Sequence, residues 1–487
     1  MALLRTDCRG CQQRDLRIKQ LVGENHVLRQ HLDEAQRQAK RQAHPFRRDD
    51  DASAADTQAA SDKQAAGDTR QPAPAGNASS RKNKVGRRKG HKADLRPVPT
   101  PAEIDRVVDV PLDKCPMCDV DLYEHGQVVQ YQTDLPSIKP IITQFNIETG
   151  KCPCCRQRWQ GRHPDQTSDA VGAAGNTLGP NVLSMAAELK HRLGVSYDKI
   201  CDYLQTYCHF QVCPAALIRA EQRLADLARP TYDALLDDLR RAKVVHADET
   251  GWRIGRTSAW LWVFSCKKAT VYTIRNSRGA DVPEDILGPD FNGYLIVDGL
   301  KTYECLDYAK GSCNAHLMRR CRNMCDTVPA REKAHVNALN TLLKEAIDLS
   351  DRRRELTSAG YHRRAQEIEN RLDEWLEANN RKHRLSDELR RLDEHVRRHR
   401  GEWLVHLHER HVPATNNHAE QMLRPAVITR KVGGCNKTPR GARVHEILAS
   451  LMATCHRQGK RFLDLARKLW QSPTPQAVAV STLPRAA

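Results

Sequence analysis

Apolar residues recur along this chain in two periods, one typical of strands and one typical of helices. Short β-branched runs end at Val245 and at Val297 and predict two buried strands. Longer apolar runs at 259–264 and 271–274 predict two more strands, which we expect to pair antiparallel. The predicted strands therefore lie in the middle of the chain.

Upstream of the strands, apolar residues at helical spacing predict three helices within residues 179–228. Breaks at Gly194 and Pro214 separate them, which gives the order of a helix-turn-helix module. Arg219 and Arg223 would lie on one side of the third helix, one turn apart, as in a DNA-recognition helix. A plain helical bundle is the alternative, because helical spacing alone does not separate the two.

Downstream of the strands, helical spacing continues for a long stretch. No proline occurs between Ala330 and Val412, and Leu339, Leu343 and Ala346 recur on one helical face. The stretch is far longer than a loop between two elements. The pattern therefore predicts a helical insertion.

The first 43 residues predict a short coiled coil. Ile18, Leu21, Leu28 and Leu32 follow a and d spacing, and Asn25 at an a position favours a paired register. We therefore expect a homodimer. A frayed surface helix is the alternative, because three heptads are marginal.

Residues 44–98 predict a disordered linker with a basic end. No Leu, Ile or Val occurs between Leu32 and Val85, so this stretch cannot bury a core. Near its end, Arg87, Arg88 and Lys89 are candidate DNA contacts. A solvated basic tail is the alternative.

Composition favours a nucleic-acid partner over a membrane. The 487 residues carry a net charge of +18, which implies an anionic partner. No apolar stretch approaches the roughly 20 residues of a membrane-spanning helix, and the N-terminus lacks the apolar core of a signal peptide. We expect a bacterial cytoplasmic, nucleoid-associated protein of several domains, whose 17 cysteines are reduced thiols or metal ligands.

Two cysteine pairs predict a structural zinc site. Cys115 and Cys118 form one CPxC knuckle, and Cys152 and Cys155 form another, so that four thiolates are available for tetrahedral Zn²⁺. Cys154 neighbours Cys155 and either could bind, but the spacing favours Cys155. Strand-like runs, such as 138–147, lie between the knuckles. The isolated pair of Cys8 and Cys11 has no assigned role.

Three acidic residues are candidate ligands for a catalytic metal. Asp248 and Asp298 each follow a strand-like run, so both carboxylates would project from strand ends, whereas Glu420 follows a helix start at 416–417. Clustered carboxylates repel each other unless divalent cations neutralise them, and Mg²⁺ suits an all-oxygen site. Glu249 is left out, because strand alternation points it away from Asp248.

Each of these acids also has a simpler explanation. An aspartate at a strand end is often a turn or cap residue, and Glu420 could pair with Arg424 one helical turn later. Arg424, Arg430 and Lys431 belong to a basic run without acids after Glu420, and are candidate phosphate contacts.

The Cys313-Asn-Ala-His316 motif leaves two possibilities open. The Cys and His could bind a metal with Cys321 or Cys325. The histidine could instead donate a hydrogen bond near the acidic cleft, and the residues favour this second alternative.

The motifs HADETGW, VDGLKTYEC, CNAHLMRR and NNHAEQMLRPAVITRK resemble the catalytic motifs of the insertion sequence sixty-six family of DDE transposases. The resemblance extends from about Arg87 to Leu469 and departs from the usual pattern at 432–436 and in the closing FLDLARKLW stretch. It implies an α/β fold, RNase H-like with a helical insertion. It further implies that Asp248, Asp298 and Glu420 bind catalytic Mg²⁺ or Mn²⁺, and that the cysteine unit is a zinc ribbon.

The resemblance therefore implies a transposase that binds the terminal inverted repeats of its element in double-stranded DNA. It would cleave a phosphodiester with metal-activated water and join the freed 3′ end to target DNA, with possible accessory proteins. A non-catalytic DNA-binding regulator and an RNase H-like structure-specific nuclease are the alternatives. The expected domains are a coiled coil (1–43), a linker (44–98), a zinc ribbon (99–165), a helix-turn-helix-like module (175–230), the first part of the catalytic core (240–325), the insertion (326–411), the core helix with Glu420 and C-terminal helices (412–470), and a tail (471–487).

Overall fold

The computed structural model describes residues 97–112, 114, 120–121, 128–380, 385–472 and 474–486. The chain divides into two units, Met1–Asp121 and Leu122–Ala487. The predicted coiled coil, the basic residues 87–89, and both Cys115 and Cys118 lie outside the described residues. In the first unit, a 3₁₀ turn, Pro101–Glu103, is capped by the Glu103 carboxylate, which accepts hydrogen bonds from the Thr100 backbone and hydroxyl at 2.7 and 2.8 Å.

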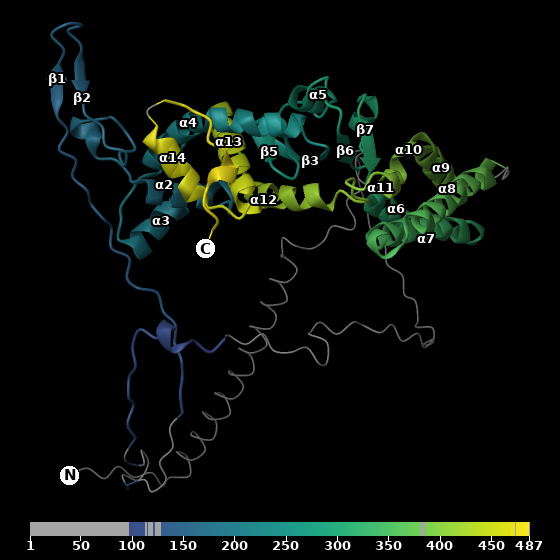
Figure 1. Ribbon diagram of the computed structural model, residues 1–487, viewed down its shortest axis with the longest axis horizontal. Coiled ribbons are helices and arrows are strands. Elements are labelled where there is room, and N and C mark those ends of the chain that lie inside the picture. The colour runs from purple at the N-terminus through teal and green to yellow at the C-terminus, as the bar shows by residue number, and fades with distance from the viewer. Residues whose placement is uncertain are drawn as a thin grey trace, which may run out of the picture. The chain divides into compact units, whose positions relative to one another are not determined.

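A five-stranded mixed sheet forms the centre of the second unit (Figure 1). Its order is β5-β4-β3-β6-β7; β3, β4 and β5 pair antiparallel, whereas β6 is parallel to both β3 and β7. The predicted antiparallel pairing of the two central apolar runs is confirmed. This mixed α/β arrangement fits an RNase H-like fold. The strands are β3 (Val244–Ile254), β4 (Thr257–Ser265), β5 (Thr270–Arg275), β6 (Tyr294–Val297) and β7 (Ala309–Ser312).

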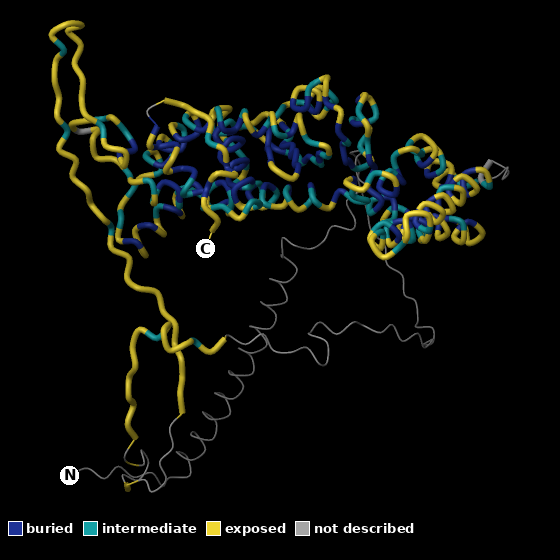
Figure 2. Tube along the Cα trace, viewed as in Figure 1, coloured by how far each residue is buried: buried dark blue, intermediate teal, exposed yellow. Residues whose placement is uncertain are grey.

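Helices cover both faces of the sheet, and each face has its own apolar core. One core joins the sheet to α4 (Pro214–Arg240), α5 (Asp281–Leu287), α13 (Pro439–Arg457) and α14 (Phe462–Gln471). The other core joins it to α12 (Asn417–Gly433) and to part of α13. Figure 2 shows the buried residues concentrated along these elements. The second face matters for function, because α12 carries Glu420.

Between residues 176 and 243, three helices precede the sheet, as predicted, but the third is longer than expected. α2 (Pro180–His191), α3 (Tyr197–Cys208) and the start of α4 enclose a small core of their own. α4 then continues through Pro230 to Arg240, and its second half packs on the sheet. The predicted helix-turn-helix module therefore shares its third helix with the catalytic core.

The region between β7 and α12 is helical and has a separate core, as its apolar spacing predicted. α6 packs against α7, and the buried residues of these helices form one cluster with those of α8, α9, α10 and α11. Ser386 caps α9 by accepting a hydrogen bond from the Leu389 backbone, as an N-cap serine does. The helices are α6 (Asn314–Thr327), α7 (Ala330–Asp351), α8 (Ser358–Asn380), α9 (Asp387–Arg398), α10 (Arg400–Trp403) and α11 (Val405–His408).

The strand-like run at 138–147 is not a strand, which corrects the sequence prediction. Ile138, Ile141 and Ile142 are exposed, and Pro140 removes a backbone donor that a ladder would need. The hairpin of this region lies just after the run and consists of β1 (Thr149–Lys151) and β2 (Arg158–Gln160). None of the helices described is both long enough and apolar enough to cross a bilayer.

Candidate active site

Asp248 lies within β3, not at a strand end as the sequence suggested. The parallel pairing with β6 stops at His246, but β3 continues for eight more residues in its hairpin with β4, where Asp248 faces Val263 across the ladder. The apolar run that predicted the strand covers only its first part. The Asp248 carboxylate accepts a hydrogen bond from the Glu249 backbone at 2.8 Å.

Asp298 is at a strand end, as predicted. It directly follows β6, and its Oδ1 accepts a hydrogen bond from the Leu300 backbone at 3.1 Å. β6 runs parallel to the first part of β3, with Ile296 opposite His246. Asp298 and Asp248 therefore follow the paired residues at the same end of the two strands.

Glu420 lies in the first turn of α12, as predicted, and Asn416 fixes this helix start to β3. The Asn416 amide donates to the Ala247 carbonyl at 2.7 Å, and its Oδ1 lies 3.0 Å from His246 Nδ1. The Asn416 backbone donates to the Cys313 sulfur at 3.1 Å. Asn416 is only 1% exposed. A buried amide therefore connects the first turn of the helix of Glu420 to the strand of Asp248.

The three carboxylates act on each other electrostatically. Burial raises the pKa of Asp248 to about 7, and the negative charges of Asp298, Glu249 and Glu420 add to this effect. Glu420 Oε1 is buried without a hydrogen-bond partner. The charged group that the structure places beside this oxygen is His316, described below.

The donor set fits a divalent metal in its chemistry and its charge. Carboxylate oxygens are hard ligands of the kind that Mg²⁺ and Mn²⁺ bind, and a cation would relieve the repulsion that raises the pKa of Asp248. In the conformations that the described side chains adopt, no three of them already form a group that could hold one ion. Glu420 is instead turned toward His316, with 3.4 Å between Oε1 and His316 Nε2.

His316, on α6, lies beside the acidic cluster. Its pKa is raised chiefly by the Cys313 side chain and further by the charges of Glu420 and Asp298, although burial opposes the change. Cys321 is fully buried in the apolar core of the insertion, and no metal-binding group of His and Cys exists among the residues described. His316 therefore contacts the acidic cluster through its ion pair with Glu420, and the hydrogen-bonding role expected from the sequence stays a prediction.

Glu249 points to the opposite face of β3, as strand alternation predicted. It is 8% exposed and accepts hydrogen bonds from Arg278 Nε and Nη2 at 3.1 and 2.8 Å. The Tyr303 hydroxyl donates to its other oxygen at 3.2 Å. Glu249 therefore has a cation of its own and is not a free ligand.

Comparison with known families identifies the chain. The family model described as Transposase IS66 family matches residues 175–444, which is more than half of the sequence. The chain belongs to the IS66 family of transposases. The match begins just before α2, ends within α13, and includes all three acids. No curated protein matches the chain.

The arginines and lysine named as DNA contacts of this transposase differ in their surroundings. Arg219 and Arg223 are exposed on α4, one turn apart. Arg424 and Lys431 are exposed on α12, and Glu420 forms its ion pair with His316 instead of Arg424. Arg430 Nη1 is already bound within the protein, to Thr250 Oγ1 at 2.9 Å and to the Gly251 carbonyl at 2.7 Å.

The described half of the proposed zinc site forms a tight turn between β1 and β2. The Cys152 backbone donates to the Gln157 carbonyl at 2.9 Å, and the Arg156 backbone donates to the Cys152 carbonyl at 3.0 Å, with Arg156 at φ 57°. Backbone hydrogen bonds from Cys155 and Cys154 lower the pKa of the Cys152 thiol. The zinc site itself stays a prediction, because Cys115 and Cys118 lie outside the described residues.

Sequence reasoning missed His246 as part of this site. It precedes Asp248 by two positions and therefore lies on the same face of β3, where it contacts Asn416 and packs edge-on against His418 at 4.9 Å between ring centroids. The period of two along VVHADETGW could have identified it. The role of Asn416 depends on a contact across 169 residues, for which the sequence carries no local signal.

Proposed function

We propose that this chain is a DNA transposase that binds the terminal inverted repeats of its element and catalyses metal-dependent phosphodiester cleavage and strand transfer. Membership of a transposase family implies DNA binding and transposition. The finer assignment rests on one observation: the pKa of Asp248 is raised to about 7 by burial and further by the charges of nearby acids, among them Asp298 and Glu420.

In this proposal Asp248, Asp298 and Glu420 hold catalytic Mg²⁺ or Mn²⁺. When bound, the metal activates the attacking oxygen and stabilises the leaving oxygen of the phosphodiester. Asp248 can bind the metal only as a carboxylate. The positive charge of a bound cation would lower the pKa of Asp248 and so favour this form.

The protein's own residues position these ligands. Asn416 and His246 hold the start of α12 against β3, so that Glu420 enters the cluster from a rigid helix turn. His316 lies within ion-pairing distance of Glu420 and orients its carboxylate. Asp298 is fixed by the Leu300 backbone.

A cavity beside His316 provides a path for a DNA strand. Its volume is about 410 Å³, and it lies between α6 and the start of α9. Arg319 and Arg320 line it, and guanidinium groups suit phosphate oxygens. We assign these two arginines to the DNA segment next to the bond that is cleaved. Arg219, Arg223, Arg424, Lys431, Arg430 and residues 87–89 are further DNA contacts in this proposal.

The remaining parts of the proposal concern assembly. A structural Zn²⁺ is held by four cysteines in this proposal: Cys115, Cys118, Cys152 and Cys155. The last two belong to the turn between β1 and β2. The coiled-coil pattern of the first residues supports a homodimer, which also suits an enzyme that brings two DNA ends together. Accessory transposition proteins are possible partners.

The test is to separate DNA binding from chemistry with Asp248→Asn. We expect this variant to bind a terminal-repeat duplex as tightly as the wild type, and to lose Mg²⁺-dependent cleavage and joining by at least about a thousandfold. Glu249→Gln is the matched control, because it neutralises the neighbouring carboxylate on the other face. Strand transfer retained by Asp248→Asn would contradict the assignment.

The same assay distinguishes the alternatives. A structure-specific nuclease would cut the duplex without forming a joined product, and a non-catalytic regulator would bind without cutting. Either result with the wild-type protein would replace the proposed function.

A further inference from the structure

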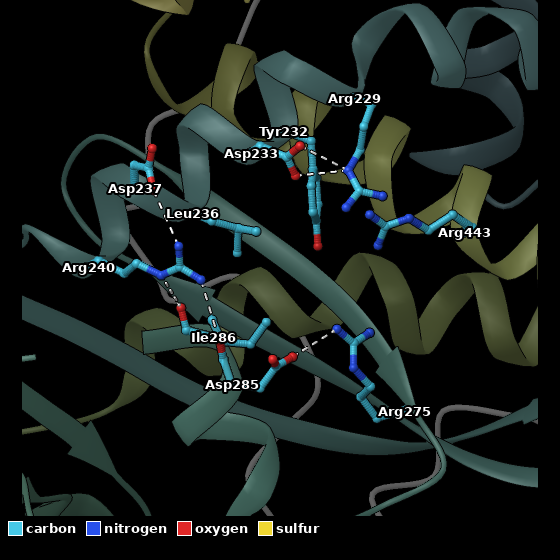
Figure 3. Close-up of a pocket in the computed structure, with 10 residues that line it drawn as sticks. All are labelled: Arg229, Tyr232, Asp233, Leu236, Asp237, Arg240, Arg275, Asp285, Ile286 and Arg443. Carbon is cyan, nitrogen blue, oxygen red and sulfur yellow. Dashed lines mark hydrogen bonds and ion pairs between the residues drawn. The ribbon is translucent and has the colours of Figure 1, made fainter. Parts of the chain in front are cut away.

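A second cavity lies among elements that carry none of the three acids. It has a volume of about 340 Å³ and is formed by α4, α5, α13 and the edge strand β5. Figure 3 shows four arginines around it: Arg229, Arg240, Arg275 and Arg443. We call it the arginine cavity. Asp248 lies in β3, Asp298 directly follows β6 and Glu420 lies in α12, so this cavity is not part of the candidate active site.

The floor of the arginine cavity is rigid, because a buried carboxylate holds two of the arginines. Glu446 is 3% exposed, and its Oε2 accepts from Arg443 Nη1 at 2.6 Å while its Oε1 accepts from Arg275 Nη1 at 3.1 Å. Arg443 also lies over the Tyr232 ring, 5.1 Å from its centroid. Tyr232 is 1% exposed and donates its hydroxyl hydrogen to the Tyr272 carbonyl. Both guanidinium groups are therefore held in place before any ligand arrives.

Two guanidinium groups that line this cavity have unused donors. They belong to Arg229 on α4 and Arg443 on α13, both drawn in Figure 3. The hydrogen bonds of Arg229 use only Nε, which donates to Asp233, and that of Arg443 uses only Nη1. The N–H groups that remain unused on both arginines can donate to an anion that enters the cavity.

The acidic residues of the cavity do not make it a cation site. Three aspartates line the cavity, and each pairs with an arginine that also lines it: Asp233 with Arg229, Asp237 with Arg240 and Asp285 with Arg275. Their side chains are 49%, 52% and 65% exposed, so water screens them, whereas the buried Glu446 carboxylate is held by Arg443 and Arg275. Leu236 and Ile286 add apolar surface beside the guanidinium groups.

We propose that the arginine cavity binds the phosphate of a phosphate ester, with Arg229 and Arg443 as its donors. Paired guanidinium groups match phosphate oxygens in geometry and charge. The volume exceeds that of one phosphate, and the apolar wall suits an attached sugar. The shared chemistry is that of a DNA backbone and of a free nucleotide. The proposal does not depend on transposase chemistry, because none of its residues touches the acidic cluster.

The experiment compares two single substitutions on α4 in the full-length protein. Arg229→Gln removes a cavity donor, whereas Arg241→Gln removes the same charge from a side chain that is 72% exposed and does not line the cavity. Arg229 pairs with Asp233 at 2.9 Å, and Arg241, at the C-terminal cap of α4, pairs with Asp238 at 3.9 Å; exposed pairs of this kind contribute little to stability. Arg443→Gln is a second test, and Arg229→Gln decides alone if that variant fails to fold.

Two probes identify the source of the phosphate. The first is a fluorescent DNA duplex, titrated by anisotropy over a range of salt concentrations; the second is deoxyadenosine monophosphate, added in a thermal-shift assay. For a DNA backbone, we expect Arg229→Gln to weaken duplex binding about three- to tenfold and to reduce the salt slope by about one, with no change in Arg241→Gln. For a free nucleotide, the monophosphate stabilises the wild type and Arg241→Gln, but not Arg229→Gln.

Either pattern supports the proposal. Equal behaviour of Arg229→Gln and Arg241→Gln with both probes would overturn it. Because both readouts measure binding and not cleavage, this result is independent of the Asp248→Asn test.

Discussion

The two faces of β3 hold adjacent carboxylates with opposite surroundings. Glu249 faces the core shared with α4 and α5, where Arg278 neutralises its charge and the Tyr303 hydroxyl donates a hydrogen bond to it. Asp248 faces the start of α12, where its neighbours are two more acids and its pKa rises to about 7. The strand is the same, so the difference comes only from what each face packs against.

This contrast separates structural acids from acids that are available for chemistry. A buried carboxylate that has its own arginine contributes to the fold, and replacing both partners is often tolerated. A carboxylate that faces others without a cation costs folding free energy, and proteins retain such arrangements at functional sites. Position in the sheet does not distinguish Asp248 from Glu249, because they are consecutive residues of β3.

The largest expected effect is on catalysis. Glu249→Gln should retain cleavage and joining activity within about tenfold of the wild type, because Gln can still accept a hydrogen bond from Arg278, whereas Asp248→Asn should lose at least about a thousandfold. Single-turnover cleavage of a terminal-repeat duplex measures both. Equal losses in the two variants would remove the distinction between the faces.

The next effect is on stability. Arg278→Met leaves the Glu249 carboxylate buried without its cation, and should lower the free energy of unfolding by about 2–3 kcal/mol in urea titrations. The double variant Arg278→Met with Glu249→Gln is the control, and should recover most of the loss because no charge is left buried. If the single variant is as stable as the wild type, Glu249 is not neutralised in the way that its hydrogen bonds indicate.

The pH dependence of stability should differ between wild type and Asp248→Asn when metal is absent. The folded-state pKa of Asp248 is raised to about 7. The contribution of Asp248 to the free energy of unfolding is therefore most favourable below pH 4, where Asp248 is protonated in both the folded and the unfolded state. This contribution is lost as the pH rises toward 7. In EDTA, the stability of Asp248→Asn relative to wild type should increase by about 2 kcal/mol from pH 5 to pH 8. A difference in stability that stays constant between pH 5 and pH 8 would mean that the pKa of Asp248 is not raised in the folded protein.

Local sequence pattern predicted the parts of this fold that depend on neighbouring residues. The antiparallel strands, the helices of the insertion, the strand end before Asp298 and the direction of Glu249 all follow from periods of two or of three to four. The first turn of α12 followed from its Asn pair and brought Glu420 to the expected place.

The errors came from contacts between distant parts of the chain. β3 extends beyond Asp248 because it forms a hairpin with β4, although its own residues turn polar there. α4 continues past Pro230 because Tyr232, Leu235 and Leu239 are buried against the sheet, and this packing outweighs the helix-breaking effect of proline. The run at 138–147 is apolar enough for a strand but has no partner strand among the described residues.

The central claim is that Asp248, Asp298 and Glu420 together bind the catalytic metal while Glu249 does not. Calorimetric titration of Mn²⁺ into the wild type and into Asp248→Asn, Asp298→Asn, Glu420→Gln and Glu249→Gln tests it most directly. We predict at least a tenfold loss of affinity in each of the first three variants and wild-type affinity in Glu249→Gln. Wild-type affinity in Glu420→Gln, or a loss in Glu249→Gln as large as that in Asp248→Asn, would contradict the account.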